Sequence, residues 1–402
     1  MSAERLCYLD NNATTRVAPE VFAAMEPFLR EQWGNPSSAY RFGRAAHDAI
    51  EAARAAVGAL IGAEAREIVF TSCGTEATNA ALHSALATQP GRRHVVTTRV
   101  EHSATLKYCQ KLEKQGVEVT WLPVEPDGTL DLGELQTALR DDTAIVSVML
   151  ANNETGVLFP VDDIAAVCRA HGVLCHTDAV QTPGKIPLDV RALGVDFASF
   201  SAHKLYAPKG VGALYVRRGT RFEPLLVGGS QESGRRGGTE NVPYIAGFGR
   251  AAELAAGGLL AAYQEVKQLR DRLEAGILRR IPGTSLNGHR TERLPNTTNI
   301  AFEGVEAEGL LLMLDQVGIC ASGGSACTTG QVTPSHVLTA MGLSAARAKS
   351  SVRFSLGIYN TEADVDHALE QLPRIVQRLR DLAPPDEPVR RPARADAVAR
   401  SP

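Results

Sequence analysis

The chain has 402 residues, a formal net charge of −3, and 44% hydrophobic and 22% charged residues. This composition is ordinary for a globular protein and excludes a fibre or a wholly disordered chain. The small charge and the scattered arginines provide no basic surface for nucleic acid, so we expect no such partner. The length exceeds what one hydrophobic core usually serves, which predicts a large domain and a smaller one.

The ends of the chain show no export or membrane signal. The start, "MSAERLCYLDNN", lacks an apolar core, and no stretch approaches the ~18 apolar residues of a membrane helix. We therefore expect a cytoplasmic protein that does not contact a membrane. Seven cysteines without CxxC pairs argue against a disulfide framework and against a zinc site. Residues 384–402, rich in Pro, Arg and Ala, are predicted to be a disordered tail.

From about residue 65 to residue 201, short β-rich runs alternate with helical patterns. "EIVFTS" precedes "GTEATNAALHSAL", "HVVTTRV" precedes "SATLKYCQKLEKQG", and "TAIVSVML" precedes "VDDIAAVCRAHG". This alternation is typical of βαβ units and predicts an α/β domain whose mostly parallel sheet has helices on both faces. Ligands of such sheets bind at the carboxyl ends of the strands.

A long helical pattern over about 242–281 follows and is predicted to link two domains. Beyond it, the strands "TTNIAFE" and "SVRFSL" and the helices "AEGLLLMLDQVG", "PSHVLTAMG" and "EADVDHALEQLPRIVQRLRDL" predict a compact α+β unit. We place the large domain at 15–258 and build the small domain from 1–14 and 259–383.

Polar residues at the ends of predicted strands point to a pyridoxal phosphate site. Lys204 follows "FASFSA", where a desolvated lysine could form a Schiff base with an aldehyde; the alternative is a surface lysine. Asp178 ends "HTD", where a carboxylate could face the pyridinium nitrogen; the alternative is a helix N-cap or a salt bridge. Gly74 and Thr75 begin a helix whose N–H groups would hold a phosphate, although such helix starts are common.

The segment "ASGGSACTTG", residues 321–330, surrounds Cys327 with glycine and hydroxyl residues. A thiol kept for packing is normally buried as a small hydrophobe, whereas this composition predicts a mobile, solvated loop. Cys327 is therefore either an incidental surface cysteine or a thiol that has to move in order to act.

Many motifs in one order resemble the cysteine desulfurases, which are homodimeric pyridoxal phosphate enzymes of fold type I. The resemblance covers about residues 6–383. "TSCGTE", "NNETGVLFP" and "RRGTRFEPLL" resemble the nitrogenase-associated, NifS-like branch in particular. The motifs are "YLDNNATT" (8–15), "GNPSS" (34–38), "VFTSCGTEA" (69–77), "VEH" (100–102), "ANNETG" (151–156), "HTDAVQ" (176–181), "SAHKLYAPKG" (201–210), "RRGGTEN" (235–241), "LPNTTNIAF" (294–302), "SGGSACT" (322–328) and "VRFSLG" (352–357).

The resemblance implies a role for each motif residue. Lys204 would bind pyridoxal phosphate covalently and then move the α-proton of L-cysteine, while Asp178 would face the pyridine nitrogen. Cys327 would attack the substrate sulfur and leave an enzyme persulfide and L-alanine. His102 would stack on the ring and relay protons, unless it is a satisfied core histidine. The other implied ligands are Gln181 and Asn153 at the phenolic edge of the ring, with Asn153 also contacting substrate; Gly74, Thr75, Ser201, His203 and, from the second subunit, Thr239 at the phosphate; and Arg353 at the substrate carboxylate.

Several alternatives remain open. Cys73 in the phosphate-binding turn and Cys320 at the end of an apolar run are the other candidate nucleophiles, and Gly323 stands where the family more often has serine. The resemblance implies that the sulfur goes to an acceptor such as a NifU-like iron–sulfur scaffold. The chain could instead be another fold-type I enzyme, either an aminotransferase or a selenocysteine lyase, or a sulfur carrier or scaffold without catalysis.

Overall fold

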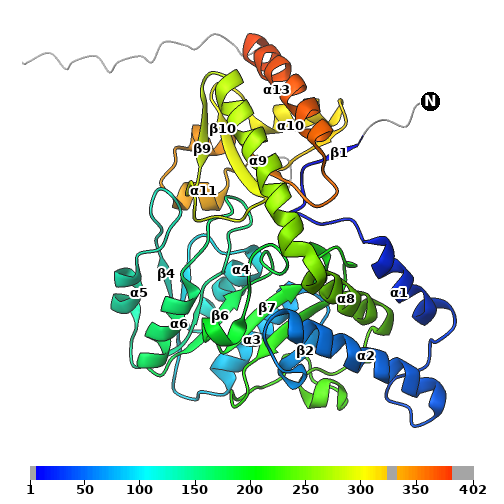
Figure 1. Cartoon of the computed structure of the whole chain (residues 1–402). Helices are drawn as coiled ribbons and strands as arrows, with labels where there is room; N and C mark the ends of the chain where they lie inside the picture. The colour runs from blue at the N-terminus through cyan, green and yellow to red at the C-terminus, as the bar shows by residue number, and fades with distance from the viewer. Residues whose placement is uncertain (1–5, 324–332, 383–402) are drawn as a thin grey trace, which may run out of the picture.

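The computed structural model of the chain describes residues 6–323 and 333–382, and the predicted tail at 384–402 lies outside this part. Figure 1 shows a large unit built around a sheet and a smaller unit above it, joined by the long helix α9 (Leu260–Arg280). The large unit is an α/β structure with a mostly parallel sheet, which confirms the predicted fold class.

The seven-stranded sheet of the large unit has the strand order β2-β8-β7-β6-β5-β3-β4. β8 pairs antiparallel with both of its neighbours, whereas all other pairs are parallel. The carboxyl ends of the parallel strands therefore meet at one edge of the sheet. The strands are β2 (Ile68–Thr71), β3 (His94–Thr98), β4 (Glu118–Leu122), β5 (Thr143–Ser147), β6 (Leu174–Asp178), β7 (Phe197–Ser201) and β8 (Gly212–Val216).

Successive side chains along the strands face two different cores. Val95 and Ile145 pack in a cluster with residues of α3 (Gly74–Ala87) and α4 (Ser103–Glu113). The next residues, Val96 and Val146, belong to a larger cluster on the opposite face. This alternation follows from the two-residue period of a strand. The larger cluster includes residues of α2 (Arg41–Leu60), α6 (Val161–Ala170) and α8 (Val242–Leu254); the other large-unit helices are α1 (Pro19–Arg30), α5 (Leu132–Ala138) and α7 (Val190–Leu193).

The smaller unit contains a three-stranded antiparallel sheet, β12-β10-β9. The N-terminal arm joins this unit, because β1 (Cys7–Tyr8) pairs with β11 (Ile319–Cys320) and Asp10 forms a bridge with Ser355. The remaining elements are β9 (Thr284–Asn287), β10 (Thr297–Phe302), β12 (Ser351–Ser355), α10 (Ala307–Asp315), α11 (His336–Ala340), α12 (Ala345–Lys349) and α13 (Glu362–Leu382).

The connection between the units is an interrupted helix rather than the single helix that the sequence predicted. A π-helical turn, Ala255–Leu259, separates α8 from α9, and Gly258 has a φ of 154° that L-residues rarely adopt. The run Val242–Arg280 contains an 18-residue window with a mean hydropathy of 1.2, so it is long and apolar enough to cross a membrane by length and composition, contrary to the expectation from the sequence. One such helix is weak evidence for a membrane span, because a core helix of a globular protein passes the same test.

Helices α1 and α2 were not assigned from the sequence. The buried side of α2 consists largely of small residues, among them Ala46, Ala53 and Gly58. Its close contact with α8 explains this composition. A Cβ added to Gly249 of α8 would lie 2.5 Å from the Cα of Ala53, so the two helices approach backbone to backbone.

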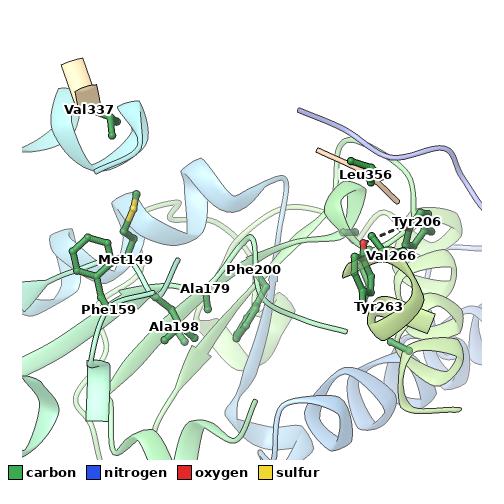
Figure 2. Close-up of a cluster of buried hydrophobic side chains, with 14 of the residues drawn as sticks. Met149, Phe159, Ala179, Ala198, Phe200, Tyr206, Tyr263, Val266, Val337 and Leu356 are labelled. Carbon is green, nitrogen blue, oxygen red and sulfur yellow. Dashed lines mark hydrogen bonds between the residues drawn. The ribbon is translucent and has the colours of Figure 1, made fainter. Parts of the chain in front are cut away.

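A buried hydrogen-bonded junction joins the two units near Lys204. The hydroxyl groups of Tyr206 and Tyr263 are 2.9 Å apart, and the N–H of Ile358 donates to the Tyr206 hydroxyl at 2.9 Å. Figure 2 shows this pair at one end of the apolar cluster, with Phe200 nearer the sheet. Tyr206 has a φ of 59°, a strained value for a bulky residue. The junction therefore holds the turn after β7 in a fixed conformation.

A buried ion pair fixes the segment that precedes Thr239. The Arg54 guanidinium contacts both carboxylate oxygens of Glu232, at 2.5 and 2.9 Å, and the N–H of Phe70 donates to the same carboxylate at 2.9 Å. The Glu232 side chain is 1% exposed, whereas Glu51, which also contacts Arg54, is 50% exposed.

We expect Glu232→Gln to lower the free energy of unfolding by about 3–5 kcal/mol, because it leaves a buried arginine without its counter-charge. Glu51→Gln is the matched control and should cost at most about 1 kcal/mol, since an exposed ion pair is weak. Urea denaturation of both variants measures the difference. Equal losses of unfolding free energy in the two variants would show that the buried ion pair contributes no more to stability than the exposed one.

Candidate active site

A cavity of about 530 Å³ lies at the carboxyl ends of β6 and β7. It gathers residues that are far apart in the sequence and come from both units and the N-terminal arm. The predicted site residues that line it are Gly74, Thr75, His102, Asn153, Asp178, Gln181, Ser201, His203, Lys204 and Arg353.

The parallel sheet explains why these residues meet. Asp178 is the last residue of β6, Ser201 is the last residue of β7, and Lys204 ends the single 3₁₀ turn that follows. Gly74 begins α3 after β2, and His102 is the N-cap of α4 after β3. Each strand thus delivers its following turn to the same edge.

The ε-amino group of Lys204 faces the N-terminal arm. Its Nζ donates to the carbonyl oxygens of Asn12 and Ala13, both at 2.6 Å. Burial, with a smaller contribution from Arg353, lowers the pKa of Lys204 to about 8, although Asp10 and Asp178 oppose the shift. A substantial fraction of the amine is therefore neutral close to physiological pH, which Schiff-base formation requires.

Asp178 and His102 both line the cavity and interact electrostatically. Burial raises the pKa of Asp178, although His102, a hydrogen bond from the Val180 N–H and Lys204 oppose the shift. Burial lowers the pKa of His102, so its imidazole is neutral near pH 7. The N–H of Ala104 donates to His102 Nδ1 at 3.1 Å, which assigns the ring proton to Nε2. His102 lines the cavity and is not enclosed in a core.

The start of α3 forms the cradle that a phosphate needs. No side chain caps this helix, so its first N–H groups face the cavity. A Cβ at Gly74 would lie 2.8 Å from Val180 Cγ2, so the backbone itself forms the wall. Arg236 pairs with Glu76 in the first turn at 2.9 Å and offsets the negative charge there.

These observations fit pyridoxal phosphate, which needs an amine, an acid, a phosphate cradle and a neutral ring contact. Lys204 supplies the amine, and Asp178 is a buried carboxyl group that pairs with no lysine or arginine in the described part of the chain. The volume and the residues present therefore agree with the predicted cofactor, while the role of each residue stays a prediction.

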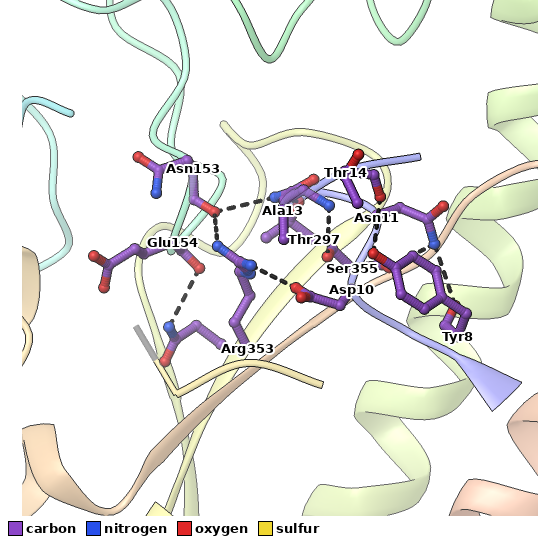
Figure 3. Close-up of polar contacts among 12 residues, drawn as sticks. Tyr8, Asp10, Asn11, Ala13, Thr14, Asn153, Glu154, Thr297, Arg353 and Ser355 are labelled. Atoms are coloured by element: carbon purple, nitrogen blue, oxygen red, sulfur yellow. Dashed lines mark hydrogen bonds and ion pairs between the residues drawn. The ribbon is translucent and has the colours of Figure 1, made fainter. Parts of the chain in front are cut away.

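Arg353 lies between the arm and the large unit, as Figure 3 shows. Its Nη2 contacts Asp10 Oδ1 at 2.6 Å, and its Nη1 donates to the Asn153 carbonyl at 2.9 Å. Its Nε is buried and has no hydrogen-bond partner among the described residues. The guanidinium is thus held in place on one side and retains a donor for an anion, such as the predicted substrate carboxylate.

Two predicted residues do not reach this cavity in the described structure. Thr239 lines a separate pocket of about 180 Å³ together with Ser72 and Arg236. Cys327 lies outside the described residues. Of the alternative nucleophiles, Cys73 lines the cavity and is half-buried, whereas Cys320 is a half-buried residue of β11 whose thiol pKa is raised by burial.

The structure also adds polar residues that the sequence analysis did not assign. Asp10 and Asn12 lie in "YLDNNATT", which contributed only to the resemblance, although both contact predicted site residues. Glu154 lines the cavity, and Lys185 is buried beneath it. The flanking sequence of Lys185, "TPGKIP", resembles an exposed turn, so no local signal marks a buried lysine.

Comparisons with known proteins agree with the predicted resemblance. The class-V aminotransferase family matches residues 7–368. A cysteine desulfurase of Trichormus variabilis is 55% identical over 377 residues, and the NifS cysteine desulfurase of Azotobacter vinelandii is 52% identical over 378; each match covers 94% of both chains.

Solved structures give the same picture. A NifS-like protein matches with a TM-score of 0.87 and 40% identity over 93% of this chain and all of its own. A protein named SspA, solved in complex with cysteine, matches with a TM-score of 0.79 and 35% identity over 88% of this chain and 99% of its own.

We expect Schiff-base formation between cofactor-free protein and pyridoxal phosphate to increase with pH around a midpoint of about 8, because Lys204 must lose a proton first. Borohydride trapping of the adduct between pH 6 and pH 10 measures the midpoint. Asp178→Asn should lower it, since the carboxylate raises the pKa of Lys204, and Lys204→Ala should trap nothing at this site. A midpoint near the ordinary lysine value of about 10.4 would contradict the expectation.

Proposed function

The chain belongs to the class-V aminotransferase family, and on this premise we propose that it is a pyridoxal-phosphate-dependent cysteine desulfurase. The observation that carries the proposal is the cavity in which Lys204, Asp178 and Arg353 meet. L-cysteine and an enzyme thiol would give L-alanine and an enzyme persulfide. This exchange balances without an external oxidant or reductant.

The cofactor supplies an aldehyde for lysine and an electron sink for the carbanion that forms at the substrate's α-carbon. Within this chain, Gly74, Thr75, Ser201 and His203 would hold the phosphate, and Asp178 would keep the ring nitrogen protonated. Lys204 Nζ would move the α-proton, and the carbonyl groups of Asn12 and Ala13 are acceptors for its protonated form.

The substrate would bind through its carboxylate. Arg353 retains a buried donor at Nε, and Asp10 and the Asn153 carbonyl fix its guanidinium plane. The similarity to a protein solved with cysteine supports an amino acid of this size. An aminotransferase could use the same carboxylate contact, so the dependence on a thiol distinguishes the two reactions.

We expect Cys327→Ala and Lys204→Ala each to lower alanine production from L-cysteine by at least about 10²-fold, because the first lacks the sulfur nucleophile and the second lacks the proton-transfer base. Cys327→Ala should still bind the cofactor, and its absorbance reports this. Cys320→Ala is the matched control and should retain most of the activity.

Normal turnover by Cys327→Ala would overturn the mechanism and favour another fold-type I enzyme. Activity with selenocysteine alone would point to a selenocysteine lyase. A purified protein that stays colourless after addition of pyridoxal phosphate would favour a sulfur carrier or scaffold without catalysis.

We further propose that the sulfur serves iron–sulfur cluster assembly for nitrogenase, with a NifU-like scaffold as acceptor. The 52% identity to the NifS cysteine desulfurase of Azotobacter vinelandii supports this branch. A cytoplasmic location is also proposed, and the free thiols of Cys73, Cys109, Cys168, Cys175 and Cys320 are compatible with a reducing compartment.

A homodimer is the proposed assembly. Large apolar side chains of the α1–α2 region are exposed, including Phe22 at 56%, Trp33 at 73% and Tyr40 at 56%, and Trp33 packs against Phe42 with ring centroids 5.0 Å apart. Exposed aromatic groups of this kind favour a protein interface. A second copy would cover them, and its Thr239 would complete the phosphate site.

We expect sedimentation of the unmodified protein to show a dimer, and Trp33→Glu to weaken the dimer at least about tenfold by placing a charge in the interface. Leu312→Glu, at a 62%-exposed leucine of α10, is the matched control and should leave the dimer intact. A monomeric unmodified protein, or equal effects of both variants, would contradict the proposed interface.

A further inference from the structure

Lys185 is a buried lysine that the proposed reaction does not use. It lies in the turn after β6 and its side chain is among the largest fully buried ones. Its Nζ donates to Gln181 Oε1 at 2.9 Å, and no carboxylate pairs with it in the described part of the chain. Burial, with smaller contributions from Lys204 and Arg353, lowers the pKa of Lys185 to about 7. Packing alone does not explain an amine in such a place.

The contact with Lys185 is the first link in a row of hydrogen bonds that reaches the catalytic lysine. Gln181 receives the Lys185 amine at Oε1, and its Nε2 donates to the Asn12 carbonyl at 3.0 Å. The same carbonyl oxygen accepts from Lys204 Nζ at 2.6 Å. Lys185 and Lys204 therefore lie at the two ends of a hydrogen-bonded chain that contains the Gln181 amide and the Asn12 carbonyl.

This row fixes the orientation of the Gln181 amide. The Lys185 amine donates a hydrogen bond, so it must face the Gln181 oxygen and not the Gln181 NH₂ group. The Asn12 carbonyl only accepts, so it must face the Gln181 NH₂ group. A flipped amide would place donor against donor and acceptor against acceptor. The observed orientation leaves the second hydrogen of Nε2 available to a molecule in the cavity, which Gln181 lines.

We propose that Lys185 is a positioning residue of the desulfurase site, which holds the Gln181 amide so that it presents an N–H donor, and not an oxygen, to the bound cofactor. The inference rests on the proposed function, because the donor would serve the negatively charged phenolic oxygen of pyridoxal phosphate. Lys185 acts only through Gln181 and touches neither cofactor nor substrate.

The test is a pH titration of the visible absorption of the cofactor-loaded protein. A donor stabilises the negative phenolic oxygen of the deprotonated form, so its loss should raise the midpoint. We expect Lys185→Met and Gln181→Met each to raise it by about one pH unit, which corresponds to one hydrogen bond to a charged group. The double variant should show the same shift as each single variant. Lys114→Met removes an exposed lysine that does not line the cavity and should leave the midpoint unchanged.

Other results would overturn the inference. If Gln181→Met shifts the midpoint and Lys185→Met does not, the Gln181 amide keeps its orientation without a hydrogen bond from Lys185. A Lys185 effect that adds to that of Gln181→Met would show that the lysine acts through its charge. If Lys185→Met does not fold, Lys185→Leu also removes the donor to Gln181 Oε1, and the same shift is expected. An unmodified protein that binds no pyridoxal phosphate would refute the proposed function itself, before Lys185 is tested.

Discussion

The N-terminal arm, residues 10–13, makes the hydrogen bonds on which the rest of the site depends. The Asn12 carbonyl accepts from both Lys204 and Gln181, which belong to the large unit. The Asn12 side chain donates to the Asn153 carbonyl at 3.1 Å and to the Thr297 hydroxyl at 2.8 Å, so one residue connects the large unit with β10 of the small unit. Asp10 then fixes Arg353. These contacts set the position of Lys204 in the large unit relative to Arg353 in the small unit.

Burial shifts the pKa values of the ionisable groups around the cavity. Lys204 and Arg353 line the cavity and both lower the pKa of the buried Lys185, and Arg353 also lowers the pKa of Lys204. The same low-dielectric surroundings raise the pKa values of Asp178 and Glu154. A cofactor with a phosphate and a phenolic oxygen brings negative charge to this excess of cationic groups. The binding of the cofactor should therefore relieve a repulsion that folding imposes.

The sequence predicted the elements that have a local signal and missed those that depend on long-range packing. Alternating β-rich and helical runs predicted the parallel sheet, and Lys204 and Asp178 could be placed at its edge because strand ends converge. The antiparallel direction of β8 and the small-residue packing of α2 against α8 have no such signal. Lys185 was missed because its flanking sequence, "TPGKIP", carries no local signal for burial, although the side chain is buried in the fold.

The described residues on either side of the predicted nucleophile are held at the cavity. Before it, Ser322 exchanges two backbone hydrogen bonds with Arg353, at 2.7 and 3.1 Å. After it, the Ser335 hydroxyl donates to Glu154 at 2.5 Å, and His336 Nε2 donates to the Glu101 carbonyl at 2.9 Å.

These anchors adjoin the predicted site residues directly, because Glu154 follows Asn153 and Glu101 precedes His102 in the chain. The anchoring residues therefore lie in the same buried and charged surroundings as the predicted site residues. The described residues that flank the predicted nucleophile are thereby hydrogen-bonded to both units at the cavity.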